Sequence, residues 1–294
     1  MHVTVLISMY NREGFIADAL DSAIAQDYHD WDILVVDDGS TDGSVEVVKS
    51  RMSDDRITLI QMKHGGCAAA TAIGIEHARG PVITSLDSDD KLMPDSLSAV
   101  LPAFECNPHL GYVWTNWVDS TGGKGTGNYL PAGRSLLDAL MSGWWEASHQ
   151  RFFRKNFYMN TRRLDVLIKY AVDFQLALLI AKTGCDTLHI PKVTYWYRIH
   201  THKMGQEHHD EQVESIRLLK KRELRGGNTA LTELYIVKIE EEIDALRSEL
   251  TGIKNCFGYK FMRRYSSIIE QALPDGTRRG ELKRRALDIL RGQS

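Results

Sequence analysis

The chain has 294 residues, long enough to bury a full core as one large domain or as a domain with an appendage. With 43% hydrophobic and 26% charged residues its composition is that of an ordinary soluble globular protein, and a formal net charge of −3 argues against nucleic acid as the main partner. The four cysteines are scattered without metal-like spacing, and we recognise no signal peptide and no membrane span, so we expect a cytoplasmic protein.

Up to about residue 90 the sequence alternates between short apolar runs and amphipathic stretches. Apolar, β-branched runs predict strands and a three-to-four spacing of apolar residues predicts helices. We predict strands at 3–7, 31–36, 56–61 and 82–86, and helices at 13–25, 44–52 and 67–78. This alternation is typical of an α/β fold in which parallel strands are joined by right-handed crossover helices.

Polar clusters follow three of these four predicted strands. They are Ser8-Met9-Tyr10-Asn11, Asp37-Asp38-Gly39-Ser40 and Asp87-Ser88-Asp89-Asp90. Ligands of open α/β sheets lie beyond the carboxyl ends of the strands, so the three clusters together predict a nucleotide and metal site there. Neighbouring carboxylates repel each other, and a divalent cation that bridges them to phosphate would neutralise the third cluster. The alternative for that cluster is an Asp-rich turn that caps the helix expected from about Pro94.

The elements beyond residue 90 are less regular. We predict a strand at 110–118, a glycine-rich loop at 120–128, helices at 134–142 and 170–182, and an extended segment at 187–199. After a polar, His-rich stretch at 201–210 the pattern is almost wholly helical and includes a short heptad stripe from Ile236 to Ile253. Such a stripe packs as a helical hairpin, as a coil between subunits, or on its own domain.

The order of the motifs resembles that of the inverting family 2 glycosyltransferases, which have the GT-A fold and use nucleotide-diphospho-sugar donors. The matching runs, collinear over residues 5–95, are Val5-Leu6-Ile7-Ser8-Met9-Tyr10-Asn11, Ala25-Gln26-Asp27-Tyr28, Val35-Val36-Asp37-Asp38-Gly39-Ser40-Thr41-Asp42, Gly65-Gly66-Cys67-Ala68-Ala69-Ala70, Leu86-Asp87-Ser88-Asp89-Asp90 and Met93-Pro94-Asp95. The resemblance continues more weakly to His200. It implies a Rossmann-like, mostly parallel sheet flanked by helices, followed by an α-helical C-terminal extension.

The expected domain organisation follows from this resemblance. A GT-A domain would span residues 1–205, with a donor half at about 1–118 and an acceptor half at about 119–205. A helical C-terminal region would span residues 206–294.

The resemblance also implies a donor site. Tyr10 would stack on a uracil base, and Asp38 would accept its imide N–H, although Asp38 also suits a plain turn. Asp89 would bind Mg²⁺ or Mn²⁺ that bridges the diphosphate oxygens. The residues expected to contact the nucleotide-sugar are Ser8, Tyr10, Asn11, Asp38, Asp87, Ser88 and Arg198.

A carboxylate at the start of a helix serves as the catalytic base in this family. The matching segment here is 169–178, and Asp173 is the expected base, with Val172 in place of the usual Glu. An Asp that faces an apolar wall has a raised pKa, which suits a general base. The alternative for Asp173 is a residue at a helix N-terminus that is favoured only by the helix dipole.

The last matching motif is Tyr197-Arg198-Ile199-His200, similar to the Tyr-Arg-x-His of the family. His200 would complete the metal coordination or bind the diphosphate, and Arg198 would pair with phosphate or carboxylate, although a lone His is more often structural.

Three further residues are assigned to the acceptor side. His149 and Arg151 lie in the region that faces the acceptor in relatives, while Asp90 would orient Asp89 or touch the sugar. Thr71-Ala72 stands where the family often has an Arg-Asn pair, so one cationic contact to the donor is missing or supplied elsewhere.

The function that these residues imply is a metal-dependent inverting transfer of a hexosyl or N-acetylhexosaminyl group from a UDP-sugar to a hydroxyl of a glycan or lipid-linked glycan, in cell-surface polysaccharide synthesis. A nucleotidyltransferase would need a glycine-rich, basic loop after the first strand, which residues 9–14 do not form. The remaining alternative is a catalytically weakened donor-binding or scaffold protein of a glycan assembly complex. The basic, aromatic segment at 257–285 suggests peripheral membrane contact at the inner face of the membrane, or a homo-oligomer.

Overall fold

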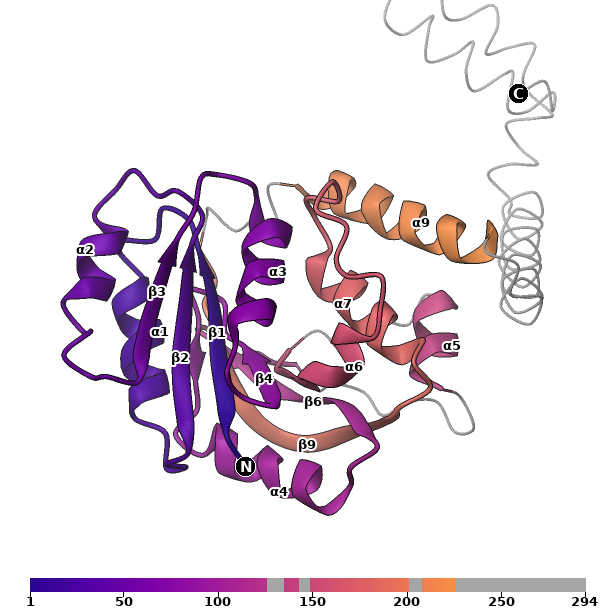
Figure 1. Cartoon of the computed structure of the whole chain (residues 1–294), viewed down its shortest axis with the longest axis horizontal. Helices are drawn as coiled ribbons and strands as arrows, with labels where there is room; N and C mark the ends of the chain where they lie inside the picture. The colour runs from indigo at the N-terminus through magenta and orange to yellow at the C-terminus, as the bar shows by residue number, and fades with distance from the viewer. Residues whose placement is uncertain (126–134, 143–148, 201–207, 226–294) are drawn as a thin grey trace, which may run out of the picture. The chain divides into compact units, whose positions relative to one another are not determined.

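The computed structural model describes residues 1–125, 135–142, 149–200 and 208–225. Their core is a mixed sheet with helices packed against it (Figure 1). The strands are β1 (Val3–Met9), β2 (Trp31–Asp37), β3 (Ile57–Gln61), β4 (Val82–Ser85), β5 (Lys91–Leu92), β6 (Leu110–Asp119), β7 (Lys124–Gly125), β8 (Arg151–Arg154) and β9 (Asp186–Tyr197). The helices are α1 (Ile16–Ile24), α2 (Ser44–Lys49), α3 (Cys67–His77), α4 (Ser96–Cys106), α5 (Leu136–Met141), α6 (Lys155–Met159), α7 (Val172–Ala181) and α9 (His209–Arg225).

The first half of the sheet is parallel, as the alternation of elements predicts. Strand β1 lies between β2 and β4, and β3 pairs with the outer edge of β2, all in parallel. Almost every residue of β1 and β2 is buried, because helices cover both faces of these strands. Both strands run further than predicted, β1 to Met9 and β2 to Asp37, so the sheet carries their polar ends to its carboxyl edge.

The second half of the sheet turns antiparallel. Strand β8 pairs antiparallel with both β4 and β6, β9 runs parallel to β6, and the short β5 pairs antiparallel with β9. The predicted strand at 110–118 and the extended segment at 187–199 are confirmed as β6 and β9. Strand β8 and helix α6 were not predicted, because a four-residue apolar run around Phe152 does not distinguish a strand from a buried helix.

Beyond residue 205 the structure describes α9, which packs on the same hydrophobic core as α7. Leu219 of this helix is fully buried there. Glu223, only 5% exposed, pairs with Arg162 and Lys182. The division at residue 205 stays a prediction, and the expectations for the heptad stripe and the basic C-terminal segment fall outside the described residues. Within the described part of the chain, no helix combines the length and the apolar character needed to cross a bilayer.

Helix α3 approaches β1 closely at Gly74. A Cβ atom at this position would lie 2.2 Å from Cδ1 and 3.1 Å from Cγ of Leu6, which is itself buried. The contact includes the branched carbon of Leu6, so a rotation of the terminal methyl groups does not relieve it. The close packing of α3 on β1 therefore requires glycine here.

We expect Gly74→Ala to lower the free energy of unfolding by about 1–2 kcal/mol, because overpacking outweighs the gain of about 1 kcal/mol in helix propensity. Urea unfolding followed by circular dichroism measures the change. Gly14→Ala is the control, since a Cβ atom there meets nothing within 4 Å. Equal stability of Gly74→Ala and the unmodified protein would contradict this packing.

Candidate functional site

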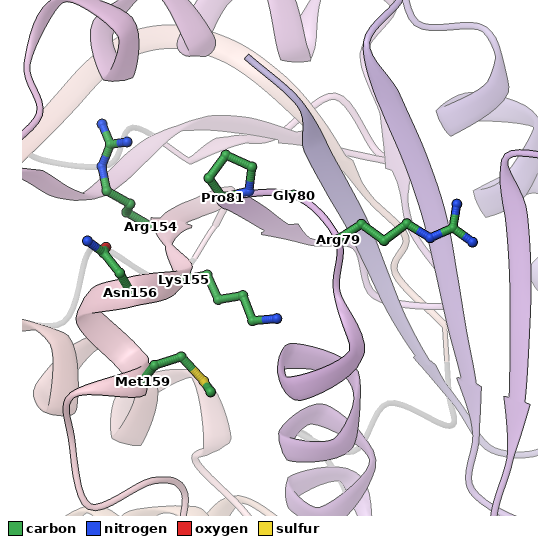
Figure 2. A pocket seen from close by; sticks show the side chains of 7 residues that line it. All are labelled: Arg79, Gly80, Pro81, Arg154, Lys155, Asn156 and Met159. Carbon is green, nitrogen blue, oxygen red and sulfur yellow. The ribbon is translucent and has the colours of Figure 1, made fainter.

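A pocket of about 430 Å³ lies at the amino end of β4, away from the polar strand ends. Figure 2 shows that the side chains of Arg79 and Arg154 point away from each other, with Lys155 and Pro81 between them. The Lys155 ammonium donates to the last carbonyls of α3, and Arg154 donates to carbonyls at the end of α4. These cations terminate helices and do not converge on a ligand, so we place the site elsewhere. The lining residues are Arg79, Gly80, Pro81, Arg154, Lys155, Asn156 and Met159.

The polar ends of β1 and β2 come together at the opposite edge of the sheet. The backbone N–H of Asp38 donates to the carbonyl of Met9 at 2.8 Å. The side-chain oxygen of Asn11 accepts the backbone N–H of Thr41 at 2.8 Å, and the N–H of Asn11 donates to Oγ of Ser40 at 2.9 Å. Asn11 thus joins the loops that follow β1 and β2, and its contact with a sugar-nucleotide donor stays a prediction.

Asp38 organises the loop before α3. One carboxylate oxygen accepts the N–H of Gly65 at 2.7 Å, and the other accepts the N–H of Gly66 at 2.9 Å and lies 3.0 Å from Nδ1 of His64. Gly66 has a φ of 92°, a conformation that favours glycine. The side chain of Asp38 is only 3% exposed, so its carboxylate serves this loop here, and its contact with a uracil base stays a prediction.

The ring of Tyr10 is 40% exposed and lies 4.4 Å from the ring of His64 at an interplanar angle of 30°. Ser8, at the end of β1, shares a hydrogen bond of 3.1 Å with Thr71 of α3. Thr71 is one of the two residues that stand where the family often carries Arg-Asn, and it brings no charge to this side of the site. Sequence analysis did not identify His64 as a neighbour of Tyr10, the residue expected to stack on the uracil ring.

Asp89 and His200 meet across 111 residues, as the resemblance implies. Nε2 of His200 lies 2.9 Å from Oδ2 of Asp89, and both side chains are about one-eighth exposed, at 13% and 12%. The imidazole stacks on Phe15, with ring centroids 4.8 Å apart. Nε of Arg12 lies 3.7 Å from the same carboxylate oxygen, a cation that sequence analysis missed.

The Asp89–His200 pair suits a divalent metal in its choice of donor atoms, one carboxylate and one imidazole. Within the described ranges, no group of three or more His, Cys, Asp or Glu side chains could hold a metal ion. Mg²⁺ or Mn²⁺ held by this pair would complete its coordination with oxygen ligands such as those of a diphosphate or of water. This is the arrangement expected of a metal that binds together with a nucleotide.

Asp90 is fully buried and ties the acidic segment to β9. Its carboxylate accepts the Tyr195 hydroxyl at 2.9 Å and the backbone N–H of Arg198 at 2.8 Å. The role of Asp90 in orienting Asp89 fits this position, whereas a direct contact with the sugar does not, because the side chain is not accessible. Ser88, expected at the donor, is also buried, at 7% exposure.

Arg198 lies where the resemblance implies but is directed at protein groups. Its Nε donates to the backbone carbonyl of Asp89 at 2.8 Å, and its Nη2 donates to Asp18 at 2.6 Å. Its guanidinium also lies over the rings of Phe15 and Trp196. Of the two expected roles of Arg198, pairing with a carboxylate is the one present here.

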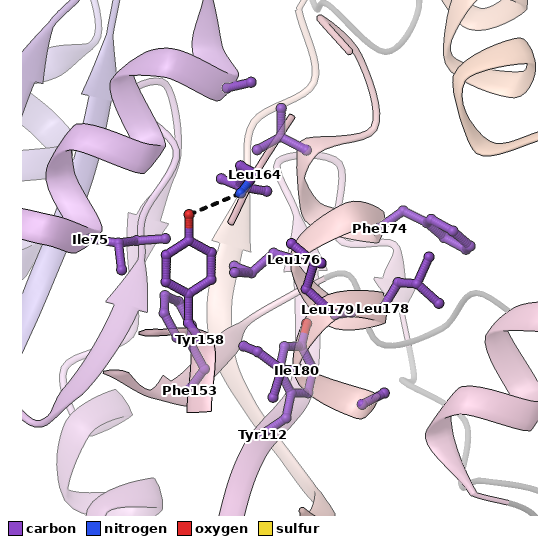
Figure 3. Close-up of a cluster of buried hydrophobic side chains, with 14 of the residues drawn as sticks. Ile75, Tyr112, Phe153, Tyr158, Leu164, Phe174, Leu176, Leu178, Leu179 and Ile180 are labelled. Atoms are coloured by element: carbon purple, nitrogen blue, oxygen red, sulfur yellow. Dashed lines mark hydrogen bonds between the residues drawn. The ribbon is translucent and has the colours of Figure 1, made fainter. Parts of the chain in front are cut away.

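Asp173 is the only charged residue of α7, whose other side chains are almost all buried in the core around Tyr112 and Phe153 (Figure 3). Burial raises the pKa of Asp173, as predicted from its apolar surroundings, although the charge of Arg151 and the N–H of Phe174 act in the opposite direction. Its carboxylate accepts the N–H of Phe174 at 2.9 Å. Ala171, the residue just before α7, has a left-handed φ of 64°, so the chain turns sharply where this helix begins.

Arg151 links the acidic segment to the expected base. Its Nη2 lies 3.2 Å from Oδ1 of Asp87, and its side chain is only 11% exposed. Burial by itself would lower the pKa of Arg151, but the charges of Asp87 and Asp173 raise it above its ordinary value. The structure therefore brings Asp87, Arg151 and Asp173 into one electrostatic unit, and Arg151 stays positively charged.

His149 lies beside this unit in an aromatic cluster. Its ring stacks on Tyr195 at 5.4 Å and 10°, and the rings of Trp117 and Tyr197 are 6.1 Å and 5.2 Å away. The Tyr195 hydroxyl in turn accepts the backbone N–H of Asp87 at 3.2 Å. The role of His149 in binding the acceptor stays a prediction.

The sequence profile described as Glycosyl transferase family 2 matches residues 4–170 of the chain. The chondroitin synthase of Escherichia coli is 26% identical over 263 residues, a span of 87% of this chain and 36% of that protein. The chain thus covers little more than a third of this relative.

Two solved glycosyltransferase structures share the fold. S. aureus TarS 1-349 in complex with UDP-GlcNAc superposes with a TM-score of 0.63 at 17% identity, over 93% of this chain and 82% of that one. The mannosyltransferase PcManGT from Pyrobaculum calidifontis, in complex with GDP-Man and Mn²⁺, gives a TM-score of 0.55 at 18% identity, over 88% and 82% of the two chains. The predicted α/β architecture is confirmed by these likenesses.

We expect Asp173→Asn to raise the free energy of unfolding at pH 7. The pKa of Asp173 is raised on folding, so the folded protein holds the proton more tightly than the unfolded chain. The stabilisation that this proton brings is complete below the ordinary carboxyl pKa of about 3.9 and is lost as the pH rises through the folded value. Asparagine removes the cost of the buried charge and keeps the oxygen that accepts the Phe174 N–H.

Urea unfolding at pH 7 and pH 4 measures this effect, which should be smaller at pH 4. Asp21→Asn is the control, because Asp21 is 59% exposed and its ion pair with Arg51 contributes about 0–1 kcal/mol. A loss of stability in Asp173→Asn at pH 7 would mean that attraction to Arg151 outweighs burial.

Proposed function

The chain belongs to glycosyl transferase family 2, and from this premise we propose that it is a metal-dependent inverting glycosyltransferase. It transfers a hexosyl or N-acetylhexosaminyl group from a UDP-sugar to a hydroxyl of a glycan or lipid-linked glycan. The observation that carries this proposal is the position of Asp173, a carboxylate of raised pKa that shares the charge of Arg151 with Asp87. Asp87 is two residues from Asp89, the expected metal ligand.

The choice of UDP rests on the nucleotide side of the site. Tyr10 offers an exposed ring on which the base can stack. Asp38 is assigned the imide N–H of uracil, which adenine and cytosine lack, and since this carboxylate is 3% exposed the contact requires the loop of Gly65 and Gly66 to move. The structural neighbour TarS was solved with UDP-GlcNAc, which supports the same donor class. Ser8 and Asn11 frame the ribose side, and Asp87 lies toward the sugar.

The metal-binding role falls to Asp89 and His200, which present one oxygen and one nitrogen at a mutual distance of 2.9 Å. When bound there with a diphosphate, Mg²⁺ or Mn²⁺ supplies Lewis-acid stabilisation of the charge on the departing nucleoside diphosphate. PcManGT, with GDP-Man and Mn²⁺, supports divalent metal use in this fold. Arg12, 3.7 Å from Asp89, adds positive charge on the same side.

The chemistry is a single displacement at the anomeric carbon. The acceptor hydroxyl oxygen forms the new bond from the face opposite the diphosphate, while its proton moves to the carboxylate of Asp173. The bond between the anomeric carbon and the phosphate oxygen breaks, and its electron pair leaves with the nucleoside diphosphate. A raised pKa makes Asp173 a stronger base than an exposed Asp, and general bases contribute about 10²–10⁴-fold to rates.

The biological product is a polysaccharide of the cell surface in this proposal. The relative named chondroitin synthase points to glycan polymers as the class of acceptor. His149 and Arg151 are proposed to face this acceptor, and the aromatic rings around His149 offer apolar faces on which a sugar ring can pack.

Asp173→Asn should lower kcat by about 10²–10⁴-fold, because the proton acceptor is lost while the donor site is untouched. Release of UDP from a panel of UDP-sugars measures the rate, and calorimetry with UDP and Mn²⁺ measures donor binding, which should stay within about threefold of the unmodified protein. Donor binding without any turnover in the unmodified protein would favour a donor-binding scaffold instead.

Arg151→Gln should shift the acid side of the kcat–pH profile to higher pH. The charge of Arg151 lowers the pKa of Asp173, so its removal raises that pKa further, and a higher pH is then needed to ionise the base. Arg154→Gln is a matched control, since that guanidinium serves carbonyls at the end of α4. An acid limb that stays at its original pH in Arg151→Gln would separate Arg151 from the base.

A further inference from the structure

Helix α1 and the chain after β9 meet beside the expected metal ligands. Nη2 of Arg198 donates to Oδ2 of Asp18 at 2.6 Å. The ring of Phe15, the residue just before α1, stacks on His200 with 4.8 Å between centroids and an interplanar angle of 25°. It also lies 5.3 Å from the guanidinium carbon of Arg198. Two neighbouring side chains of the α1 region thus hold two residues of the segment that ends in His200.

Arg198 extends this contact to the acidic segment. Its Nε donates to the backbone carbonyl of Asp89 at 2.8 Å, and its backbone N–H donates to Asp90 at 2.8 Å. Asp18 also forms an ion pair with Lys91, whose Nζ lies 3.1 Å from Oδ2, so Lys91 and Arg198 both contact this carboxylate. A chain of contacts therefore runs from Asp18 through Arg198 to the backbone of Asp89.

We propose that Asp18 and Phe15 are positioning residues that hold Asp89 and His200 at the distance a shared metal ion requires. Asp18 fixes the guanidinium that holds the Asp89 carbonyl, and Phe15 fixes the plane of the His200 imidazole. Neither residue touches the ion. The inference rests on the proposed function, since it assigns the metal to Asp89 and His200.

The physical reason is that the two candidate ligands seen among the described residues come from segments 111 residues apart. Because Asp89 and His200 come from distant segments, a shift of one segment relative to the other would move one side chain away from a shared ion and weaken its binding. Residues behind metal ligands typically change metal affinity by about 10–100-fold when removed. Asp18 and Phe15 would act from behind the ligands in this way, because Asp18 contacts Arg198 and Phe15 contacts His200.

A purely structural role for Asp18 makes a different prediction. The Asp18–Arg198 pair is partly exposed, at 45% and 20% for the two side chains. Ion pairs of this kind contribute about 0–1 kcal/mol to stability, so a structural role would change the unfolding temperature slightly and leave metal affinity alone. Metal affinity is therefore the measurement that separates the two roles.

The experiment compares Asp18→Asn with Asp21→Asn, a neighbour on the same helix that also pairs with an arginine, Arg51, but away from the site. Electron paramagnetic resonance of free Mn²⁺, titrated at saturating UDP, gives the Mn²⁺ affinity of the full-length protein. We expect Asp18→Asn to weaken Mn²⁺ binding about tenfold, with UDP affinity at saturating Mn²⁺ within about threefold. Asp21→Asn should bind Mn²⁺ like the unmodified protein.

Two further variants test the two contacts separately. Phe15→Leu keeps apolar bulk against the core but removes the stacking face, and should weaken Mn²⁺ binding in the same direction. The double variant Asp18→Asn/Arg198→Gln should bind Mn²⁺ no more weakly than Arg198→Gln alone, because Asp18 acts through Arg198. Additive losses would show that the two residues act separately.

Unchanged Mn²⁺ affinity in Asp18→Asn, with intact binding by the unmodified protein, would overturn this inference and leave the proposed function standing. Absence of Mn²⁺ and UDP binding in the unmodified protein would overturn the metal assignment itself, and the positioning role with it. The same loss in Asp21→Asn as in Asp18→Asn would point to a general effect of charge on α1.

Discussion

The fully buried carboxylate of Asp90 is the contact on which the geometry of the site depends. It joins the end of the parallel half of the sheet to β9 through the Tyr195 hydroxyl and the Arg198 backbone, across 105 and 108 residues. A buried carboxylate that loses its partners costs about 3–5 kcal/mol, so the acidic segment has a single favourable place. Because Asp90 is held inside, Asp89 meets His200 at the edge of the sheet.

The balance of charge among Asp87, Arg151 and Asp173 links stability to the proposed chemistry. Asp87 and Asp173 share one guanidinium, that of Arg151, whose pKa burial by itself would lower but the two carboxylates raise. The attraction does not offset the burial of Asp173, so its pKa remains raised. A group that is costly to ionise in the folded protein is also a more effective proton acceptor, and such groups gather at functional sites.

The departures from the family pattern have local explanations. Thr71 replaces a cation but bonds to Ser8 at the end of β1, while the positive charge near Asp89 comes from Arg12 on a different loop. Val172 stands where a Glu is usual, and at 9% exposure it packs into the core. A Glu there would place a second carboxylate beside Asp173. With Val172, Asp173 is the only charge on an otherwise apolar helix.

The sequence alone was enough to predict the strand and helix alternation up to β4 and the polar clusters after three of these strands, because local periodicity and turn chemistry encode both. The family resemblance located Asp89, Asp173 and His200. Only the tertiary structure decided that Arg151 faces Asp87, that Asp90 is buried, and that Asp18 holds Arg198. These contacts join residues 64, 108 and 180 positions apart, and no local pattern encodes which distant partners meet. The two-residue strand β5 exists for the same reason, since pairing with β9 alone defines it.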